Sequence, residues 1–95
     1  MGATTYKDIT FSIDVNYSSG YTFVKFYAPW CGHCQMMATD WEEVGEFITK
    51  NPIPSVDLSI AEIDCVENAL VCMREAVDSY PTIKMYKPGE LIFCF

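Results

Sequence analysis

The apolar residues of this chain fall into short runs typical of strands and one longer stretch with helical spacing. Tyr21–Tyr27 is aromatic or β-branched at nearly every position, which predicts a central strand buried on both faces. From Cys34 to about Lys50 apolar residues recur every three or four positions, which predicts an amphipathic helix. The apolar residues with this spacing are Met37, Trp41, Val44 and Ile48.

The rest of the chain shows shorter segments of the same two kinds. Strands are predicted at Tyr6–Thr10, Val56–Asp64 and Thr82–Tyr86. Helical stretches are predicted at Phe11–Tyr17 and Asn68–Val77. The apolar residues through which the second stretch would pack, in some combination, are Leu70, Val71, Met73 and Val77.

A tight turn near the C-terminus completes the pattern. Lys87–Glu90 has Pro and Gly at its central positions, which predicts a type II turn with Leu91–Phe95 as the hairpin partner strand. A parallel crossover needs a helix, and a tight turn makes an antiparallel pair. The order of segments therefore predicts an α/β fold with a mixed central sheet flanked by helices.

Length and composition restrict the class of protein. The chain has 95 residues, which predicts one domain over residues 1–95, and 51% of them are apolar, too many for a disordered segment. Its formal charge of −7 argues against a nucleic-acid partner, since phosphate contacts need basic patches. No apolar run approaches the ~18 residues of a membrane span, so we expect no membrane partner. The N-terminus lacks the features of a signal peptide, so either the chain is cytosolic or its targeting segment was removed.

Five cysteines are the candidate chemical groups, and two of them lie in the segment Ala28–Cys34 between the central strand and the amphipathic helix. This places Cys31 at a helix N-terminus, where unpaired N–H groups and the helix dipole favour a thiolate. The neighbouring His33 favours it further, and a stabilised thiolate makes the disulfide more oxidising. Cys34, one helical turn later, can reach the same sulfur, and Gly32 would supply room for the approach.

Two other roles for this cysteine pair are a zinc site and a purely structural disulfide. A zinc site needs four ligands, and Cys65 and Cys72 are spaced too widely for the second ligand pair, so we expect no metal. A purely structural disulfide between Cys31 and Cys34 would close too small a loop to constrain the unfolded chain. The pattern favours a redox site.

At these residues the sequence resembles the catalytic domains of protein disulfide isomerases, which have a thioredoxin fold. His33 separates it from thioredoxins proper, which usually have proline there. The matching segments are Phe26–Cys34, Trp41–Glu43, Ile63–Cys65 and Tyr80–Thr82.

The resemblance implies an enzyme that oxidises and isomerises disulfides of secretory polypeptides in the endoplasmic reticulum lumen. Its partners would be unfolded or misoxidised protein clients, and glutathione or an upstream oxidase. It would need no cofactor beyond the Cys31–Cys34 disulfide. The location rests on the resemblance, because the sequence shows neither a signal peptide nor a retention tail. The alternative is a redox-silent module that binds clients or serves as a chaperone subunit.

The resemblance also assigns roles to individual residues. Cys31 would be the attacking thiol and Cys34 the resolving thiol. Pro81 is similar to the family's cis-proline, and Trp30 and Tyr80 would contact a client peptide with it. Without the resemblance, Pro81 would be interpreted as an ordinary proline at the start of a strand.

Two positions depart from the family pattern. Lys25 stands where the family usually has a buried acid, and we hypothesise that it lies near Cys34 and stabilises its thiolate. The alternative is that only the stem of Lys25 packs while the amine reaches solvent. Thr39 replaces a helix-kinking proline, so we expect a straighter helix.

Three cysteines, Cys65, Cys72 and Cys94, lie outside the Cys31–Cys34 motif. Cys65 and Cys72 match a second pair that forms a disulfide in some family members, for which we prefer a structural role over a redox relay. Cys94 has no counterpart, so it is either a small buried side chain or an intermolecular partner. The chain ends before the last helix of a thioredoxin fold, and the family's arginine beyond it. We expect a truncated module of a larger protein, or a partly bare sheet face with Phe93 and Phe95 exposed.

Overall fold

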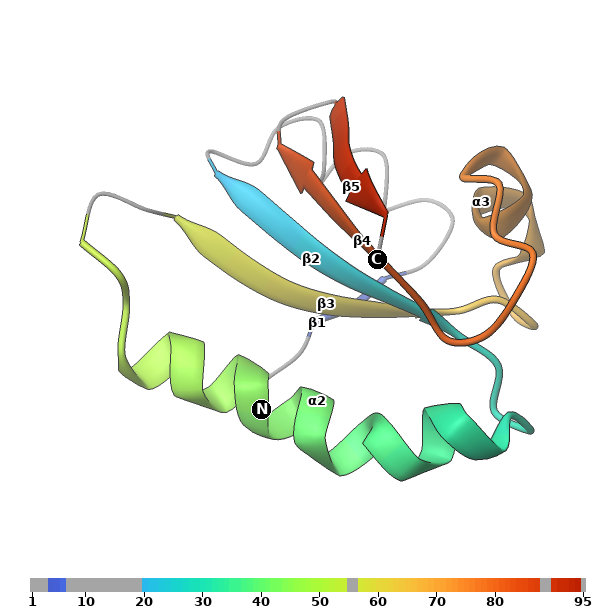
Figure 1. Cartoon of the computed structure of the whole chain (residues 1–95), viewed down its shortest axis with the longest axis horizontal. Coiled ribbons are helices and arrows are strands. Elements are labelled where there is room, and N and C mark those ends of the chain that lie inside the picture. The colour runs from blue at the N-terminus through green and yellow to red at the C-terminus, as the bar shows by residue number, and fades with distance from the viewer. Residues whose placement is uncertain (1–3, 7–19, 55–56, 88–89, 95) are drawn as a thin grey trace.

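The computed structural model describes residues 4–6, 20–54, 57–87 and 90–94. They form one sheet and two helices (Figure 1). In chain order the elements are β1 (Thr4–Tyr6), β2 (Tyr21–Tyr27), α2 (Gly32–Lys50), β3 (Leu58–Asp64), α3 (Ala69–Arg74), β4 (Thr82–Lys87) and β5 (Glu90–Cys94).

The sheet is mixed, with the strand order β1-β3-β2-β4-β5. β3 runs parallel to both β1 and β2, whereas β4 is antiparallel to β2 and to β5. This confirms the predicted α/β architecture. β2 lies at the centre and is covered on both faces: Val24 and Phe26 are fully buried on one face, and Lys25 is buried on the other.

The helix α2 runs along one face of the sheet (Figure 1). α3 lies at the end of the sheet where β3 finishes and β4 begins, and its Val71 and Cys72 pack into the core with sheet residues. The indole N–H of Trp41 donates a hydrogen bond of 2.9 Å to the carbonyl oxygen of Ala61, which ties α2 to β3. α2 is continuous over 19 residues, in keeping with Thr39 in place of a proline. It begins at Gly32, earlier than predicted, because Cys31 serves as its N-cap.

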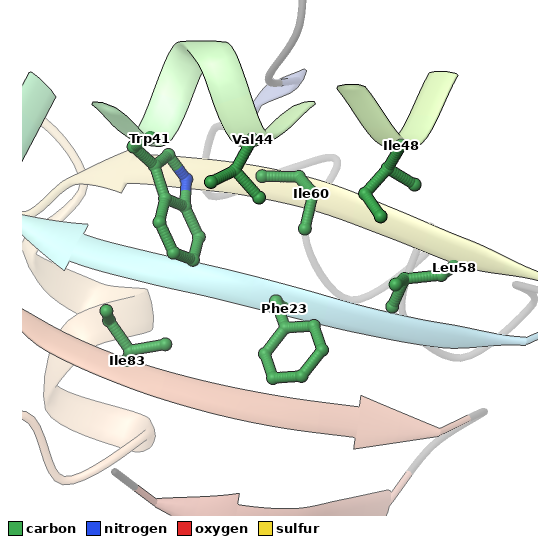
Figure 2. Close-up of a pocket in the computed structure, with 7 residues that line it drawn as sticks. All are labelled: Phe23, Trp41, Val44, Ile48, Leu58, Ile60 and Ile83. Carbon is green, nitrogen blue, oxygen red and sulfur yellow. The ribbon is translucent and has the colours of Figure 1, made fainter. Parts of the chain in front are cut away.

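The predicted apolar stripe of α2 is only partly buried. Trp41 is buried, but Val44 remains 43% exposed. The stripe borders an apolar groove of about 400 Å³ between α2 and the sheet, where side chains from both point toward one another (Figure 2). The groove is lined by Phe23, Trp41, Val44, Ile48, Leu58, Ile60 and Ile83. The expectation of a partly bare sheet face rests on Phe93 and Phe95, whose side chains lie outside the described part of the chain.

The helix α3 is shorter than predicted. It ends at Arg74 because Ala76 has a positive φ of 57°, which is left-handed backbone that cannot continue a helix. Val71 is fully buried and Val77 packs against the core, but Leu70 and Met73 are exposed. Only two of the four apolar residues considered for packing therefore face the core.

Several predictions concern residues that the structure does not describe. β1 ends at Tyr6, and the rest of the strand predicted at Tyr6–Thr10 lies outside the described residues, as does the predicted helix at Phe11–Tyr17. The same holds for the centre of the predicted turn, residues 88–89, although its two strands pair as expected.

Candidate active site

The first turn of α2 places two cysteine sulfurs beside each other. Cys31 has extended backbone (φ −79°, ψ 120°) and caps the helix, and its Sγ accepts a hydrogen bond of 3.3 Å from the backbone N–H of Cys34. The turn before the helix is held by Cys31 N–H donating to the carbonyl oxygen of Ala28 at 3.1 Å. Gln35 Nε2 donates to the carbonyl oxygen of Pro29 at 2.8 Å and fixes the turn from the helix side.

The two thiols are both free and have opposite acidities. The hydrogen bond from the Cys34 side chain lowers the pKa of Cys31, and the backbone N–H groups of Cys34 and His33 lower it further against the opposing effect of burial. Burial raises the pKa of Cys34, which is 3% exposed. Cys31 is therefore the better thiolate and leaving group, and Cys34 is a protonated partner within reach.

The loop before β4 forms the other side of the site. The Tyr80–Pro81 peptide bond is cis, as the resemblance implies. The Cys31 thiol donates to the carbonyl oxygen of Tyr80 at 3.5 Å, and the Tyr80 ring meets the Trp30 ring edge-on at 5.7 Å between centroids. Trp30 is 69% exposed. The structure thus places Trp30 and Tyr80 beside Cys31, with Pro81 next to Tyr80 in the chain, as the resemblance implies.

Gly32 and His33 lie between the two cysteines in the chain. His33 is exposed, and it acts on Cys31 through its backbone N–H. A Cβ at Gly32 would meet no described atom within 4 Å other than those of its chain neighbours and its own helix backbone, so the role expected for Gly32 in the approach of Cys34 to Cys31 stays a prediction.

Lys25 lines the same cavity as Cys34, which places it near that thiol as hypothesised. Its side chain is 3% exposed, so the alternative in which the amine reaches solvent is wrong. Its Nζ lies 3.8 Å from Glu62 Oε1 and 5.2 Å from the centre of the Tyr27 ring. The ammonium lowers the pKa of Cys34, although burial outweighs it and the net shift is upward.

Glu62 was missed by the sequence analysis. It pairs with Lys25 across β2 and β3, and both side chains line a cavity of about 210 Å³ that Cys34 also lines. A carboxylate inside an apolar strand was the available signal, but its position relative to Lys25 depends on the parallel register.

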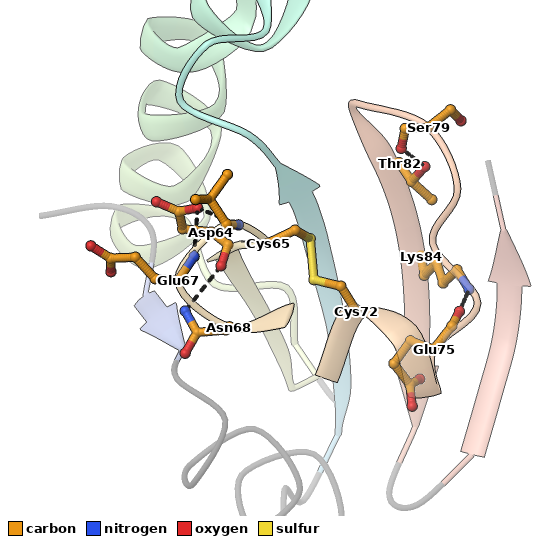
Figure 3. Close-up of a disulfide and its surroundings, with 10 residues drawn as sticks. Asp64, Cys65, Glu67, Asn68, Cys72, Glu75, Ser79, Thr82 and Lys84 are labelled. Carbon is orange, nitrogen blue, oxygen red and sulfur yellow. Dashed lines mark hydrogen bonds between the residues drawn. A yellow bond between two sulfur atoms is a disulfide. The ribbon is translucent and has the colours of Figure 1, made fainter. Parts of the chain in front are cut away.

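A disulfide joins Cys65 and Cys72, with their Cα atoms 5.7 Å apart (Figure 3). Both residues are buried, and the bond links the end of β3 to α3. Because these cysteines are bonded to each other, they do not supply ligands to a zinc site with Cys31 and Cys34. Within the described residues no group of three or more metal-ligating side chains occurs.

The far end of α3 is fastened to β4. Lys84 is buried, and its Nζ donates to the carbonyl oxygen of Glu75 (Figure 3). The hydroxyl of Tyr86 donates to Glu75 Oε1 at 2.6 Å. Since residues 75–79 lead directly to Tyr80, these contacts support the loop beside the two thiols.

The chain also resembles known proteins in sequence. The family model for thioredoxin matches residues 3–94. The thioredoxin domain-containing protein 5 homolog of Drosophila melanogaster is 41% identical over 77% of this chain and 17% of its own length. Protein disulfide isomerase-like 2-2 of Oryza sativa subsp. japonica is 39% identical over 86% of this chain and 21% of its own length.

Solved structures agree with these sequence relatives. The first two thioredoxin domains of Naumovozyma dairenensis Eps1p match 97% of this chain with a TM-score of 0.86 and 26% identity, over 34% of that chain. The fold and the two-cysteine site therefore define a thioredoxin-type redox domain.

This chain belongs to the thioredoxin family, and the predicted resemblance to protein disulfide isomerases is confirmed. Domains of this kind use a redox-active disulfide and no external cofactor. The chain spans about a fifth or less of the length of the relatives described above. Among the described residues, no helix has the length and apolar character needed to cross a membrane.

Proposed function

We propose that this domain forms and rearranges disulfides in unfolded or misoxidised secretory polypeptides through Cys31 and Cys34. The observation that carries the proposal is the hydrogen bond from Cys34 N–H to Cys31 Sγ at the start of α2. This hydrogen bond supports a thiolate at Cys31, while burial keeps the second thiol, Cys34, protonated.

The reaction proceeds by two thiol–disulfide exchanges. The Cys31 thiolate attacks a client disulfide, forms a mixed disulfide with one client sulfur and releases the other as a thiolate. Either a client thiolate then displaces Cys31, which completes isomerisation, or Cys34 attacks Cys31. In the second case the Cys31–Cys34 disulfide forms, the client leaves reduced, and the proton of Cys34 is lost.

The same steps in reverse oxidise a client. A client thiolate attacks Cys31 of the Cys31–Cys34 disulfide and Cys34 leaves, taking up a proton. A second client thiolate then releases Cys31. The domain ends reduced, so glutathione disulfide or an upstream oxidase must restore its disulfide.

The surface around Cys31 supports the binding of a protein client. Trp30 offers a largely exposed ring, and the Tyr80 carbonyl, which precedes Pro81 in the chain, contacts Cys31. An extended peptide could contact the Trp30 ring while its own sulfur approaches Cys31. The location we propose is the endoplasmic reticulum lumen, supported by the similarity to protein disulfide isomerases.

Refolding of a small secretory protein with scrambled disulfides tests the proposal. We expect the wild-type domain in a glutathione buffer to restore the native client, and Cys31→Ser to abolish this activity. Cys34→Ser should retain part of the isomerisation and accumulate mixed disulfides, because resolution is lost. If the wild-type domain restores no more client than Cys31→Ser does, the proposal is wrong and a client-binding module is favoured.

A further inference from the structure

A cavity of about 210 Å³ lies behind the active-site turn, on the side of the buried thiol. This volume exceeds by far the ~10–15 Å³ that one water requires. Among the described residues, the cavity is lined by Lys25, Tyr27, Ala28, Pro29, Cys34, Gln35, Ala38 and Glu62.

The cavity matters because Cys34 has to lose a proton each time it attacks Cys31. Cys34 is 3% exposed, so bulk solvent has little direct access to its thiol. Burial raises the pKa of Cys34, so the thiol keeps its proton at neutral pH. A proton acceptor that the thiol can reach would therefore accelerate this step.

The chemistry of the lining residues leaves one acceptor. Burial also raises the pKa of Tyr27, so its phenol stays protonated. The Lys25 ammonium has only donors, and the Gln35 amide is not a base at neutral pH. Glu62 is the one carboxylate among the described residues that line the cavity.

The sheet holds Glu62 in place. Lys25 and Glu62 are direct partners in the parallel pairing of β2 and β3, and their charged atoms lie 3.8 Å apart. The ammonium of Lys25 is buried, whereas the Glu62 side chain is 22% exposed. Glu62 can therefore face the cavity on one side and exchange protons with solvent on the other.

We propose that Glu62 accepts the proton of Cys34 when the mixed disulfide is resolved, through water in the cavity. This inference rests on the proposed function and assigns a proton path to its second step. The Cys34 thiol gives its proton to the Glu62 carboxylate, its sulfur bonds to Cys31, and the bond between Cys31 and the client breaks. The client thiolate leaves with the electron pair, and Glu62 passes its proton to solvent. In the reverse direction the protonated Glu62 returns a proton to Cys34 as it leaves.

A chromogenic aromatic disulfide, used in place of a client, separates the two steps in a single turnover. Attack by Cys31 releases one coloured thiolate, and resolution by Cys34 releases a second. The phase that disappears in Cys34→Ser is the resolution phase. The reagent reports these steps whether or not the domain acts on protein clients, so a failure of the proposed function appears only in the client-refolding assay.

We expect Glu62→Gln to slow the resolution phase by about tenfold or more at neutral pH and to leave the first phase unchanged. The defect should shrink as the pH rises, because hydroxide then removes the Cys34 proton directly. Glu62→Asp keeps a carboxylate and should recover part of the rate. Glu46→Gln removes the same charge from an exposed position on α2 that does not line the cavity, and both its phases should match the wild type.

The direction of the change separates this role from a purely electrostatic one. If Glu62 only balanced the charge of Lys25, Glu62→Gln would leave that ammonium uncompensated beside Cys34, favour its thiolate and accelerate resolution. An unchanged or faster resolution phase in Glu62→Gln would overturn the proposal, as would an equal slowing at every pH. An unchanged first phase shows in the same trace that the variant is folded.

Discussion

The backbone N–H of Cys34 lies 3.3 Å from the sulfur of Cys31, across the first turn of α2. The two cysteines in this turn shift each other's pKa in opposite directions. The Cys34 side chain lowers the pKa of Cys31, and the Cys31 side chain adds to the burial that raises the pKa of Cys34. Cys31 is therefore the more reactive thiol of the pair, and Cys34 is the thiol that keeps its proton.

The first prediction concerns the acidity of Cys31. An ordinary thiol titrates near pH ~8.5. We expect alkylation of Cys31 by iodoacetamide to have its midpoint below that value, since hydrogen bonds stabilise the thiolate. Cys34→Ala should raise the midpoint more than Cys34→Ser, because serine retains a side-chain donor. Equal midpoints in these two variants would contradict the assignment of the side-chain hydrogen bond.

The same shift gives a pH dependence of stability in the reduced protein. The pKa of Cys31 is lower in the folded than in the unfolded chain, so its thiolate stabilises the fold above the unfolded pKa. This contribution is lost as the pH falls through the folded pKa. Urea unfolding of reduced wild type and Cys31→Ser should therefore show a difference in unfolding free energy that grows from acid to alkaline pH. A difference independent of pH would show that the shift is absent.

Lys25 provides a third prediction. Its ammonium favours the Cys34 thiolate, so Lys25→Gln should raise the pKa of Cys34. The measurement is the pH profile of Cys34 alkylation in a Cys31→Ser background, where Cys34 is the remaining active-site thiol. Lys50→Gln, at the exposed end of α2, is the matched control and should leave the profile unchanged. A fall in the pKa of Cys34 after Lys25→Gln would contradict the stabilising role.

The disulfide between Cys65 and Cys72 is predicted to be structural. Replacing both residues with serine should lower the unfolding free energy by about 2 kcal/mol, because a short loop is no longer closed in the unfolded chain. The first and second phases with the chromogenic disulfide should persist. Loss of the second phase alone would instead favour a redox relay from this pair to the active site.

The link between α2 and the sheet gives a prediction on stability. Trp41→Phe removes the hydrogen bond to the Ala61 carbonyl, which we expect to lower the free energy of unfolding in urea by about 1 kcal/mol. Trp30→Phe makes the same change at an exposed ring and should cost little. Equal effects of the two substitutions would show that the Trp41 hydrogen bond does not contribute.

Local patterns were sufficient to predict most of the fold. The apolar run of β2, the spacing of Trp41 in α2 and the paired strands β4 and β5 all appear where their residue types place them. The length of α3 was not predictable in this way, because it depends on the left-handed backbone of Ala76, which alanine rarely adopts.

The part of the site that lies in one short sequence segment was predictable, and the part that comes from another strand was not. Cys31 and Cys34 are neighbours in sequence, and the helix N-terminus follows from the segment that contains them. Glu62 lies far from them in sequence, and it joins the site through the register of β2 and β3. The sequence offers no local rule that fixes this register, so the pairing of Lys25 with Glu62 required the structure.

The reduction potential of the Cys31–Cys34 pair tests the central claim most directly. It is measured by equilibrating the domain with mixtures of reduced and oxidised glutathione and trapping the thiols at each ratio. Because Cys31 is stabilised as a thiolate, we expect an oxidising reduction potential of about −180 mV, as in protein disulfide isomerase. A value below about −300 mV, as in structural disulfides, would contradict a role in exchanging disulfides with clients.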